Sequence, residues 1–317
     1  MYKRLLTIPM AAMLILLAAC SSGGSAGNNT DNTAESKPTR SVEYLGNSYQ
    51  IPARTKQIAL VGSHGTYEDA LLLGIPPFAA TTDKNGTFPH EYATITQNAT
   101  HLPWNVADNI TELTTLAPDV ILTTDKTSAE DIKKLQAAGT VIPVSTNGAY
   151  WADNLRLVAD IRGREESVDT LIHKLTQNTQ TMHDKLVPLK DKQVLIVWYQ
   201  EGDFFVYPEN ERYNHLLYTE LALTLPDIVA KVKERTPVSM EMLAQADPDY
   251  LFVMVDKIGA PTDAAAFDQL QQSAPWADLK AVKANQAYVN AVDPVLAGGT
   301  VYSNQQFLMA LQKHLLK

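Results

Sequence analysis

The sequence predicts an α/β protein with two lobes joined by one long α-helix. Short runs of β-branched and aromatic residues alternate with segments of helical spacing, which is typical of parallel sheets covered by helices on both faces. The alternation occurs twice, before and after one long amphipathic stretch at residues 165–186. Because about 280 residues follow position 40, the chain is long enough to bury two separate cores.

The first series opens with a strand at residues 57–62 and a helix at 66–74. Gly74 and Pro76 predict the end of this helix, since glycine suits a left-handed C-cap and proline cannot continue a helix. Further strands are predicted at 76–82, 119–124 and 141–145, and further helices at 109–117 and 128–139.

The second series contains a pattern that also occurs in the first: a helix, a Pro-Asp pair and a buried strand. The pairs are Pro118-Asp119 and Pro248-Asp249. This repeat favours related lobes only weakly, because α/β proteins generally use such turns. The strands of the second series are predicted at 193–200, 204–208, 250–256 and 287–293, and its helices at 214–223, 239–246 and 302–316.

The stretch between the two series carries one apolar stripe over about six helical turns. A single helix joining the lobes is the simplest interpretation, and the alternative is a helix that packs on one lobe only. The stripe consists of Val168, Leu171, Ile172, Leu175, Met182 and Leu186, with Thr179 filling the gap.

The N-terminus has the features of a secretory signal peptide, predicted at residues 1–19. Lys3 and Arg4 precede an apolar run that is too short for a comfortable membrane span. Leu-Ala-Ala followed by Cys20 resembles the bacterial lipobox, which implies cleavage before Cys20 and lipidation of its thiol. The alternative is an ordinary signal peptide with a chance cysteine.

Residues 20–40 are predicted to form a flexible tether between the lipid and the folded body. The segment is rich in Ser, Gly, Asn and Thr, and it has too little apolar surface to fold. A tether of this kind keeps the folded body close to the membrane.

Composition excludes several classes of partner. The formal net charge of −9 argues against nucleic acid and against adhesion to anionic lipid, but a few local basic groups still suffice for a small anionic ligand. Cys20 is the only cysteine, so no disulfide framework supports the body, which we expect to be a monomer.

These features together resemble the class III solute-binding proteins of ABC importers, specifically the iron–siderophore branch. Besides the lipobox, the resemblance rests on Leu-Gly-Ile-Pro-Pro at 73–77, Gly-Arg-Glu-Glu at 163–166 and Leu-Tyr-x-Glu-Leu at 217–221. It implies two Rossmann-like lobes, at 41–163 and 190–317, joined by a linker helix at 164–189, with the ligand in the cleft between them.

The resemblance also implies a function. The protein would be a receptor without catalytic activity or cofactor, lipid-anchored at the extracytoplasmic face of the cell membrane. It would capture a ferric siderophore and deliver it to an ABC permease with its ATPase. Glu68 and Glu220 match the two helix glutamates that meet an arginine pocket on the permease in this family. From the residues alone, each would be a solvated helix carboxylate.

The ligand site is expected to contain cations and aromatic faces, because an iron-loaded siderophore is bulky and rich in oxygen. The resemblance points to Arg212, as in hydroxamate binders, and to Lys84, as in catecholate binders. Seven aromatic residues at strand ends or in loops are a plausible lining, although each alone is more typical of packing. They are Trp104, Tyr150, Trp151, Trp198, Tyr199, Tyr207 and Tyr213, of which the Tyr150-Trp151 pair suits packing against the linker helix equally well.

Three other functions remain as alternatives. His64, His90 and His101 are available for a bare transition metal, but they form no close ligand motif. A receptor for haem or a corrinoid would use an axial His or Tyr. An exported enzyme is the weakest alternative, because the chain has no G-x-S-x-G, Walker or G-x-G-x-x-G motif.

Overall fold

The structure, a computed structural model, describes residues 38–256 and 259–316. The signal peptide, Cys20 and nearly all of the predicted tether lie outside these residues. Strand β1 (Thr39–Tyr44) already includes the last two residues of the segment predicted as the tether. Within the described part of the chain, no helix has the length and apolar character needed to span a membrane.

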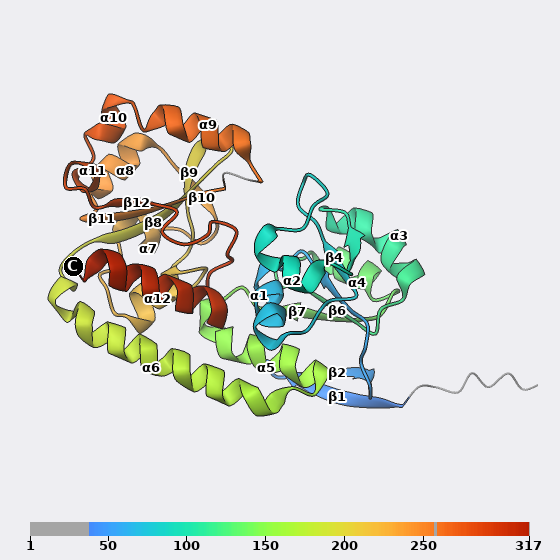
Figure 1. Ribbon diagram of the computed structural model, residues 1–317. Helices are drawn as coiled ribbons and strands as arrows, with labels where there is room; N and C mark the ends of the chain where they lie inside the picture. The colour runs from blue at the N-terminus through green and yellow to red at the C-terminus, as the bar shows by residue number, and fades with distance from the viewer. Residues whose placement is uncertain (1–37, 257–258, 317) are drawn as a thin grey trace, which may run out of the picture. The chain divides into compact units, whose positions relative to one another are not determined.

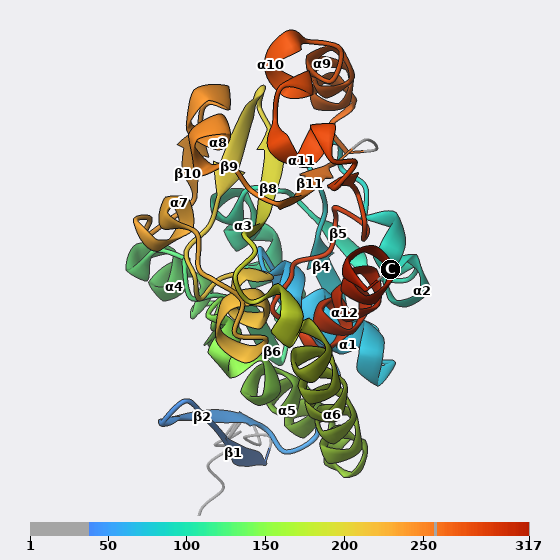
Figure 2. The ribbon, with the colours of Figure 1, turned by 90° about the vertical axis from the view of Figure 1, so that its left-hand side faces the viewer.

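A two-stranded hairpin, which the sequence patterns did not predict, opens the described chain. Strands β1 and β2 (Asn47–Pro52) pair antiparallel around a turn at Leu45-Gly46, where both residues have positive φ. The hairpin packs against the first half of the protein, and the Tyr44 hydroxyl donates a hydrogen bond to Asn154 Oδ1 at 2.6 Å (Figure 2).

The predicted parallel sheet is present in the first half, with strand order β5-β4-β3-β6-β7, and the sequence patterns did not predict its edge strand β5. Its central strand is buried along its whole length, which is usual where helices cover both faces. The strands are β3 (Ile58–Val61), β4 (Ala79–Thr81), β5 (Thr100–Leu102), β6 (Val120–Thr124) and β7 (Thr140–Val144), and the helices are α1 (His64–Leu73), α2 (Ala93–Thr96), α3 (Val106–Leu116), α4 (Ala129–Leu135) and α5 (Trp151–Arg162), with 3-10 turns η1 (His90–Tyr92) and η2 (Gly148–Tyr150).

The second half contains a mixed sheet with strand order β10-β9-β8-β11-β12, whereas the sequence predicted a parallel one. Strand β9 (Asp203–Val206) runs antiparallel to β8 (Val194–Gln200). The reason is local: only Glu201 and Gly202, both with positive φ, separate the two strands, and a parallel pair would need a long crossover. Strand β10 (Thr236–Val238) pairs antiparallel with β9, β11 (Tyr250–Val255) pairs parallel with β8, and β12 (Ala287–Val289) pairs parallel with β11.

The helices of the second half differ from prediction in two ways: the helices at 227–230, 261–270, 274–277 and 280–283 were not predicted, and the predicted helix at 214–223 is irregular. The segment 214–223 forms a π-helical turn, η5 (His215–Glu220), in which the Leu221 amide donates to the Leu216 carbonyl. The chain then leaves the helix at Ala222, where φ is positive. The remaining helices are α7 (Asp227–Ala230), α8 (Met240–Ala246), α9 (Pro261–Leu270), α10 (Ala274–Ala277), α11 (Lys280–Lys283) and α12 (Val301–Leu315).

The predicted linker helix is confirmed as α6 (Val168–Leu186), preceded by the 3-10 turn η3 (Glu165–Ser167) and followed by η4 (Val187–Leu189). Its buried residues are members of the predicted stripe. Helix α6 contacts α5 of the first half as well as α12 and η5 of the second (Figure 1). It therefore packs on elements from both halves, which decides against packing on one lobe only.

The two Pro-Asp pairs have the same structural role. Asp119 Oδ2 accepts from the amides of Lys56 and Gln57, at 2.8 and 3.0 Å, directly before β3. Asp249 Oδ2 accepts from the Gln193 amide at 2.9 Å, directly before β8. Each carboxylate thus ties the start of the central strand to the strand beside it, β6 or β11.

Candidate ligand cleft

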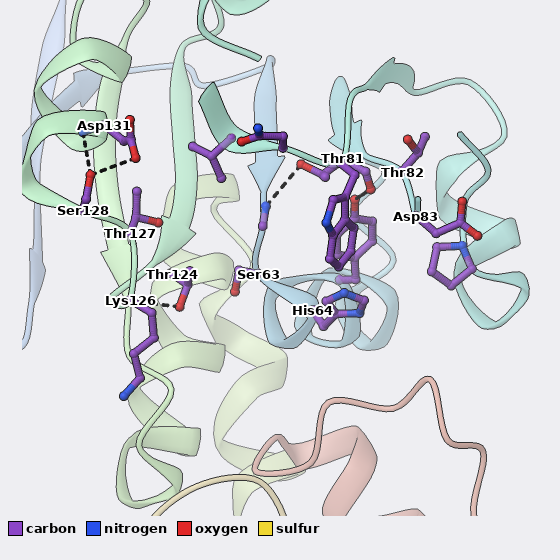
Figure 3. Close-up of a pocket in the computed structure, with 16 residues that line it drawn as sticks. Ser63, His64, Thr81, Thr82, Asp83, Thr124, Lys126, Thr127, Ser128 and Asp131 are labelled. Carbon is purple, nitrogen blue, oxygen red and sulfur yellow. Dashed lines mark hydrogen bonds between the residues drawn. The ribbon is translucent and has the colours of Figure 1, made fainter. Parts of the chain in front are cut away.

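A cavity of about 600 Å³ opens at the carboxyl ends of β3, β4 and β6 (Figure 3). In open α/β sheets, ligands bind in this position. A second cavity of about 250 Å³ shares Ser63, His64 and Lys126 with the first, and it adds Tyr207, Arg212 and residues 297–300 from the second half. Because they share lining residues, we treat the two cavities as one site, the ligand cleft.

Arg212 lines the cleft as a cation without a carboxylate partner among the described residues. Its guanidinium lies over the ring of Tyr207, 4.3 Å from the centroid, and 5.1 Å from that of Trp198. One nitrogen donates to the Ala297 carbonyl at 3.2 Å. A guanidinium held against aromatic rings keeps other N–H donors for the oxygen atoms of an anion.

A close backbone approach holds Arg212 in place. Gly298 has φ +73°, and a Cβ added to it would lie 2.9 Å from the Arg212 carbonyl carbon. Arg212 itself has a left-handed φ of 52°. Glycine is therefore required at position 298 both for its backbone angle and for space.

Lys126 is a cleft residue that the sequence analysis missed. It follows β6 and lines both cavities, and its ammonium donates to Glu211 Oε1 at 2.8 Å. The Lys126 side chain remains 59% exposed. The argument used for Lys84, a lysine directly after a strand of the first sheet, applies equally to Lys126 and would have found it.

His64 faces the cleft in its neutral form. His64 is exposed to the cleft, and partial desolvation by nearby protein atoms, with the charge of Arg212, lowers the pKa of His64. Trp104 lies edge-on to His64 with ring centroids 6.4 Å apart, and it is 48% exposed. Trp104 thus offers a free aromatic face within the cleft.

Residues 61–291 match the periplasmic binding protein family. Over 308 residues the chain is 32% identical to the iron-uptake system-binding protein of Bacillus subtilis, covering 96% of this chain and 97% of that protein.

The chain belongs to the periplasmic binding protein family. Its structure resembles that of the triscatecholate siderophore-binding protein FeuA from B. subtilis, complexed with ferri-bacillibactin. The TM-score is 0.82 and the identity 33%, over 87% of this chain and 98% of FeuA. The petrobactin-binding protein YclQ from B. subtilis shares the fold, with a TM-score of 0.73 and 18% identity over 89% and 100% of the two chains. The family consists of substrate-binding proteins, which confirms the prediction that the chain is not an enzyme.

Several aromatic residues predicted to line the cleft of this periplasmic binding protein are core residues instead. Tyr199 packs against Phe204 and Phe267, and Tyr213 packs against Phe307. Trp198 is also buried, but it lies beneath Arg212 and so supports a cleft residue. Trp198 and Tyr199 belong to the buried strand β8, and Tyr213 lies in a buried turn before η5, so their burial was not evident from their place near strand ends.

Lys84 and Tyr150 are exposed outside the ligand cleft. Lys84 belongs to a loop in which Asp83 accepts hydrogen bonds from Asn85 and Thr87. Trp151 also lies outside the cleft, since its indole nitrogen donates to Glu220 Oε1 at 2.7 Å. Of the predicted aromatic lining, Trp104 and Tyr207 are the residues that line the cleft.

Glu68 is buried, which contradicts the expectation of a solvated carboxylate on the outer end of a lobe. Its carboxylate accepts hydrogen bonds from the Ala297 amide at 2.6 Å, the Tyr92 hydroxyl at 3.2 Å, and the hydroxyls of Thr300 and Ser303. Burial raises the pKa of Glu68, and these hydrogen bonds oppose the rise. Glu68 therefore joins α1 to the segment that leads into α12.

Glu220 is partly covered. Besides the hydrogen bond from Trp151, it lies 3.6 Å from His215 Nε2, and its side chain is 19% exposed. Burial raises the pKa of Glu220, and the Trp151 hydrogen bond opposes the rise. Its remaining exposure leaves the carboxylate reachable from solvent, unlike that of Glu68.

Asp69 is buried with no hydrogen-bond partner for either carboxylate oxygen in the described structure. Desolvation, and then the charge of Glu68, raises the pKa of Asp69 well above its ordinary value. The folded protein therefore holds a proton here at pH values where the unfolded chain has released it. The contribution of Asp69 to the free energy of unfolding is therefore fully present below about pH 4, and it is lost as the pH rises through the pKa of Asp69 in the folded protein.

We expect Asp69→Asn to raise the free energy of unfolding at pH 7.5 by about 1–3 kcal/mol, because the amide removes the cost of an unsatisfied buried carboxylate. The gain should disappear near pH 4, where the parent side chain is protonated in both states. Urea unfolding at both pH values measures this, with Asp227→Asn at a 92% exposed side chain as the control. An equal effect at both pH values would contradict the raised pKa.

Proposed function

We propose that this protein is the extracytoplasmic receptor of an ABC importer and that it captures a ferric siderophore. The observation that carries the proposal is the ligand cleft, in which Arg212 presents a guanidinium without a carboxylate partner among the described residues, on an aromatic floor. The likeness to FeuA, which was solved with ferri-bacillibactin, supports this ligand class.

Among siderophores, we propose an anionic triscatecholate complex. Catecholate oxygens around Fe³⁺ carry negative charge and accept hydrogen bonds, so they suit Arg212 and the exposed ammonium of Lys126. Trp104 offers an aromatic face to the catechol rings. Neutral His64 adds polarity without charge.

A binding panel tests the proposal. Purified protein is titrated with ferric triscatecholate, ferric trihydroxamate, ferric citrate, haem and cobalamin, and tryptophan fluorescence is followed. Trp104 lies in the cleft and reports occupancy directly. We expect the triscatecholate complex to bind most tightly and its visible absorbance to remain with the protein through desalting. Preference for trihydroxamate would overturn the ligand class, and preference for haem or cobalamin would overturn the function.

The proposal includes a lipid anchor at Cys20 and delivery to a permease with its ATPase. Within the family resemblance, Glu220 remains the proposed permease contact, since its carboxylate is partly exposed. Glu68 no longer suits this role, because a buried carboxylate with four donors is not accessible to an arginine pocket. A monomer suffices for such delivery.

The anchor is tested by Cys20→Ala. Without the thiol no lipid attaches, so no acyl chain holds the processed protein at the bilayer. We therefore expect the variant protein to move from the membrane fraction to the soluble extracytoplasmic fraction while it still binds ligand. Immunoblots of both fractions measure the shift, with Ser21→Ala as the neighbouring control. Retention of cleaved variant protein in the membrane fraction would show that Cys20 is not the anchor.

A further inference from the structure

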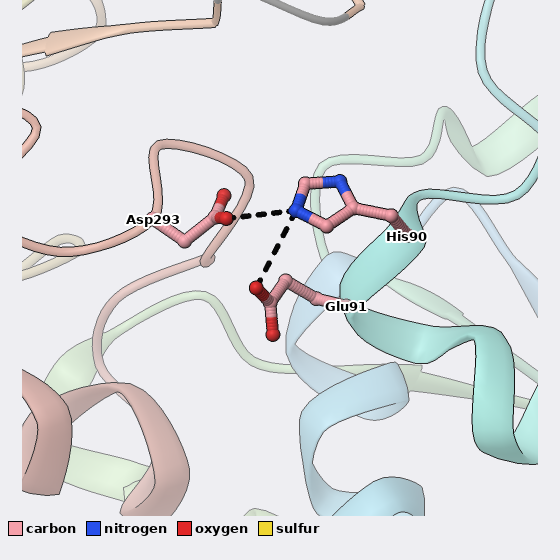
Figure 4. Close-up of side chains that lie close together, drawn as sticks. All are labelled: His90, Glu91 and Asp293. Atoms are coloured by element: carbon pink, nitrogen blue, oxygen red, sulfur yellow. Dashed lines mark hydrogen bonds and ion pairs between the residues drawn. The ribbon is translucent and has the colours of Figure 1, made fainter.

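A cluster of one histidine and two carboxylates lies apart from the ligand cleft (Figure 4). His90 and Glu91 belong to the 3-10 turn η1 of the first half, and Asp293 follows β12 of the second half. The Nε2 atom of His90 is 2.9 Å from Asp293 Oδ2 and 3.4 Å from Glu91 Oε1. One donor atom from each residue lies within 4.8 Å of the other two.

The loop that carries Asp293 is well braced. The Val295 amide donates to Asp293 Oδ1 at 2.9 Å, which leaves Oδ2 directed at His90. The loop starts at Asn290, whose side chain bonds both the amide and the carbonyl of Val255 at 2.8 Å. Asp293 is thus positioned from the carboxyl ends of β11 and β12, and a fixed donor loses little freedom when it binds an ion.

The surroundings of the cluster suit a cation. A cavity of about 400 Å³ adjoins it, lined by His90, Asp256, residues 290–292, Asp293 and Pro294. The described residues that line this cavity include no lysine or arginine. The side chains of His90, Glu91 and Asp293 are 46%, 29% and 24% exposed, so an ion reaches them from solvent. The cavity also leaves room for water molecules to complete a coordination shell.

We propose that His90, Glu91 and Asp293 bind one divalent transition-metal ion, such as Zn²⁺ or Mn²⁺, that bridges the two halves of the protein. An imidazole nitrogen with two carboxylate oxygens is a donor set that such ions accept, whereas Ca²⁺ and Mg²⁺ prefer oxygen alone. It is a resident ion, separate from the cargo, and none of its ligands lines the ligand cleft.

The bridge has a structural consequence. Two ligands come from a segment of the first half and the third from a loop of the second, about 200 residues later in sequence. Another contact beside it joins the same two halves, since Asn85 Nδ2 donates to the Gly259 carbonyl at 3.3 Å. A bound ion would strengthen this connection and stabilise the folded protein by mass action.

Isothermal titration of chelator-treated protein with ZnCl₂, MnCl₂ and CaCl₂ tests the proposal. We expect Zn²⁺ and Mn²⁺ to bind at one site per chain and Ca²⁺ to bind at least tenfold more weakly. His90→Ala and Asp293→Asn should each weaken Zn²⁺ binding by about tenfold or more. Zn²⁺ should also raise the melting temperature of the parent protein but not of these variants, both of which must first be shown to be folded by circular dichroism.

The matched control is His183→Ala. His183 Nδ1 lies 3.1 Å from Asp184 Oδ1 on α6, so this residue forms a similar pair without a third ligand. The His183→Ala substitution should leave the affinity of the protein for Zn²⁺ unchanged. The proposal is overturned if no ion binds, if Ca²⁺ binds as tightly as Zn²⁺, if the two cluster variants bind like the parent, or if His183→Ala abolishes binding. None of these outcomes depends on which siderophore the protein carries.

Discussion

Glu68→Ala is expected to lower the free energy of unfolding by about 3–5 kcal/mol, the largest loss that we predict for any single substitution in this protein. The carboxylate accepts from Tyr92, Ala297, Thr300 and Ser303, and its removal leaves these buried donors without an acceptor. Glu68→Gln should cost less, since one acceptor oxygen remains. Urea unfolding followed by circular dichroism measures both variants.

The same variants test whether Glu68 acts on the ligand cleft. Ala297 donates its amide to Glu68 and accepts from Arg212 through its carbonyl, so loss of Glu68 releases the acceptor of the cleft arginine. We therefore expect ligand affinity to fall along with stability in Glu68→Gln. Glu130→Ala, at a 77% exposed side chain on α4, is the control and should change neither quantity. A Glu68→Ala protein as stable as its parent would show that the carboxylate is not buried in solution.

Arg212→Ala is expected to weaken binding of the ferric triscatecholate by roughly ten- to a hundredfold. Loss of a hydrogen bond from a charged donor costs about 1.5–3 kcal/mol, and partial burial on Tyr207 and Trp198 strengthens the guanidinium contact. Arg212→Lys should fall between parent and alanine variant, because an ammonium keeps the charge but not the planar fork. Fluorescence titration measures all three proteins.

Arg235→Ala is the matched control for Arg212. Arg235 also lies over an aromatic ring, 3.4 Å from the centroid of Phe205, but it pairs with Glu201 outside the ligand cleft. The Arg235→Ala variant should bind the ligand with the affinity of the parent protein, within experimental error. If Arg212→Ala bound every ferric complex as tightly as the parent, recognition would rest on Lys126 and Trp104 instead.

The sequence by itself determined the central strands of both sheets and the long helix. Hydrophobic spacing predicted β3, β6, β8 and β11 within one or two residues, because strand and helix periods are local properties of the chain. Gly74, with φ 64°, ends α1 as predicted, since that backbone angle suits glycine. The apolar stripe predicted α6 because a helix that packs along one side needs one continuous apolar face.

Some cleft residues were also within reach of the sequence. Arg212 and Trp104 were predicted as ligand residues and lie in the cleft. The pattern of a lysine after a strand end, which pointed to Lys84, also fits Lys126, which lines the cleft. Such signals identify strand ends, where open α/β sheets bind ligands. They do not tell which strand end lines the cleft. The answer depends on which loops of the other half of the protein face each strand end.

Only the tertiary structure decided which polar residues are buried and which distant residues meet. A helix glutamate such as Glu68 has the same local pattern whether water or α12 covers it, and the structure shows that the segment 297–303 supplies its donors. The His90–Asp293 pair likewise joins residues about 200 positions apart. Local spacing carries no information about such pairs, because the packing of whole elements brings them together.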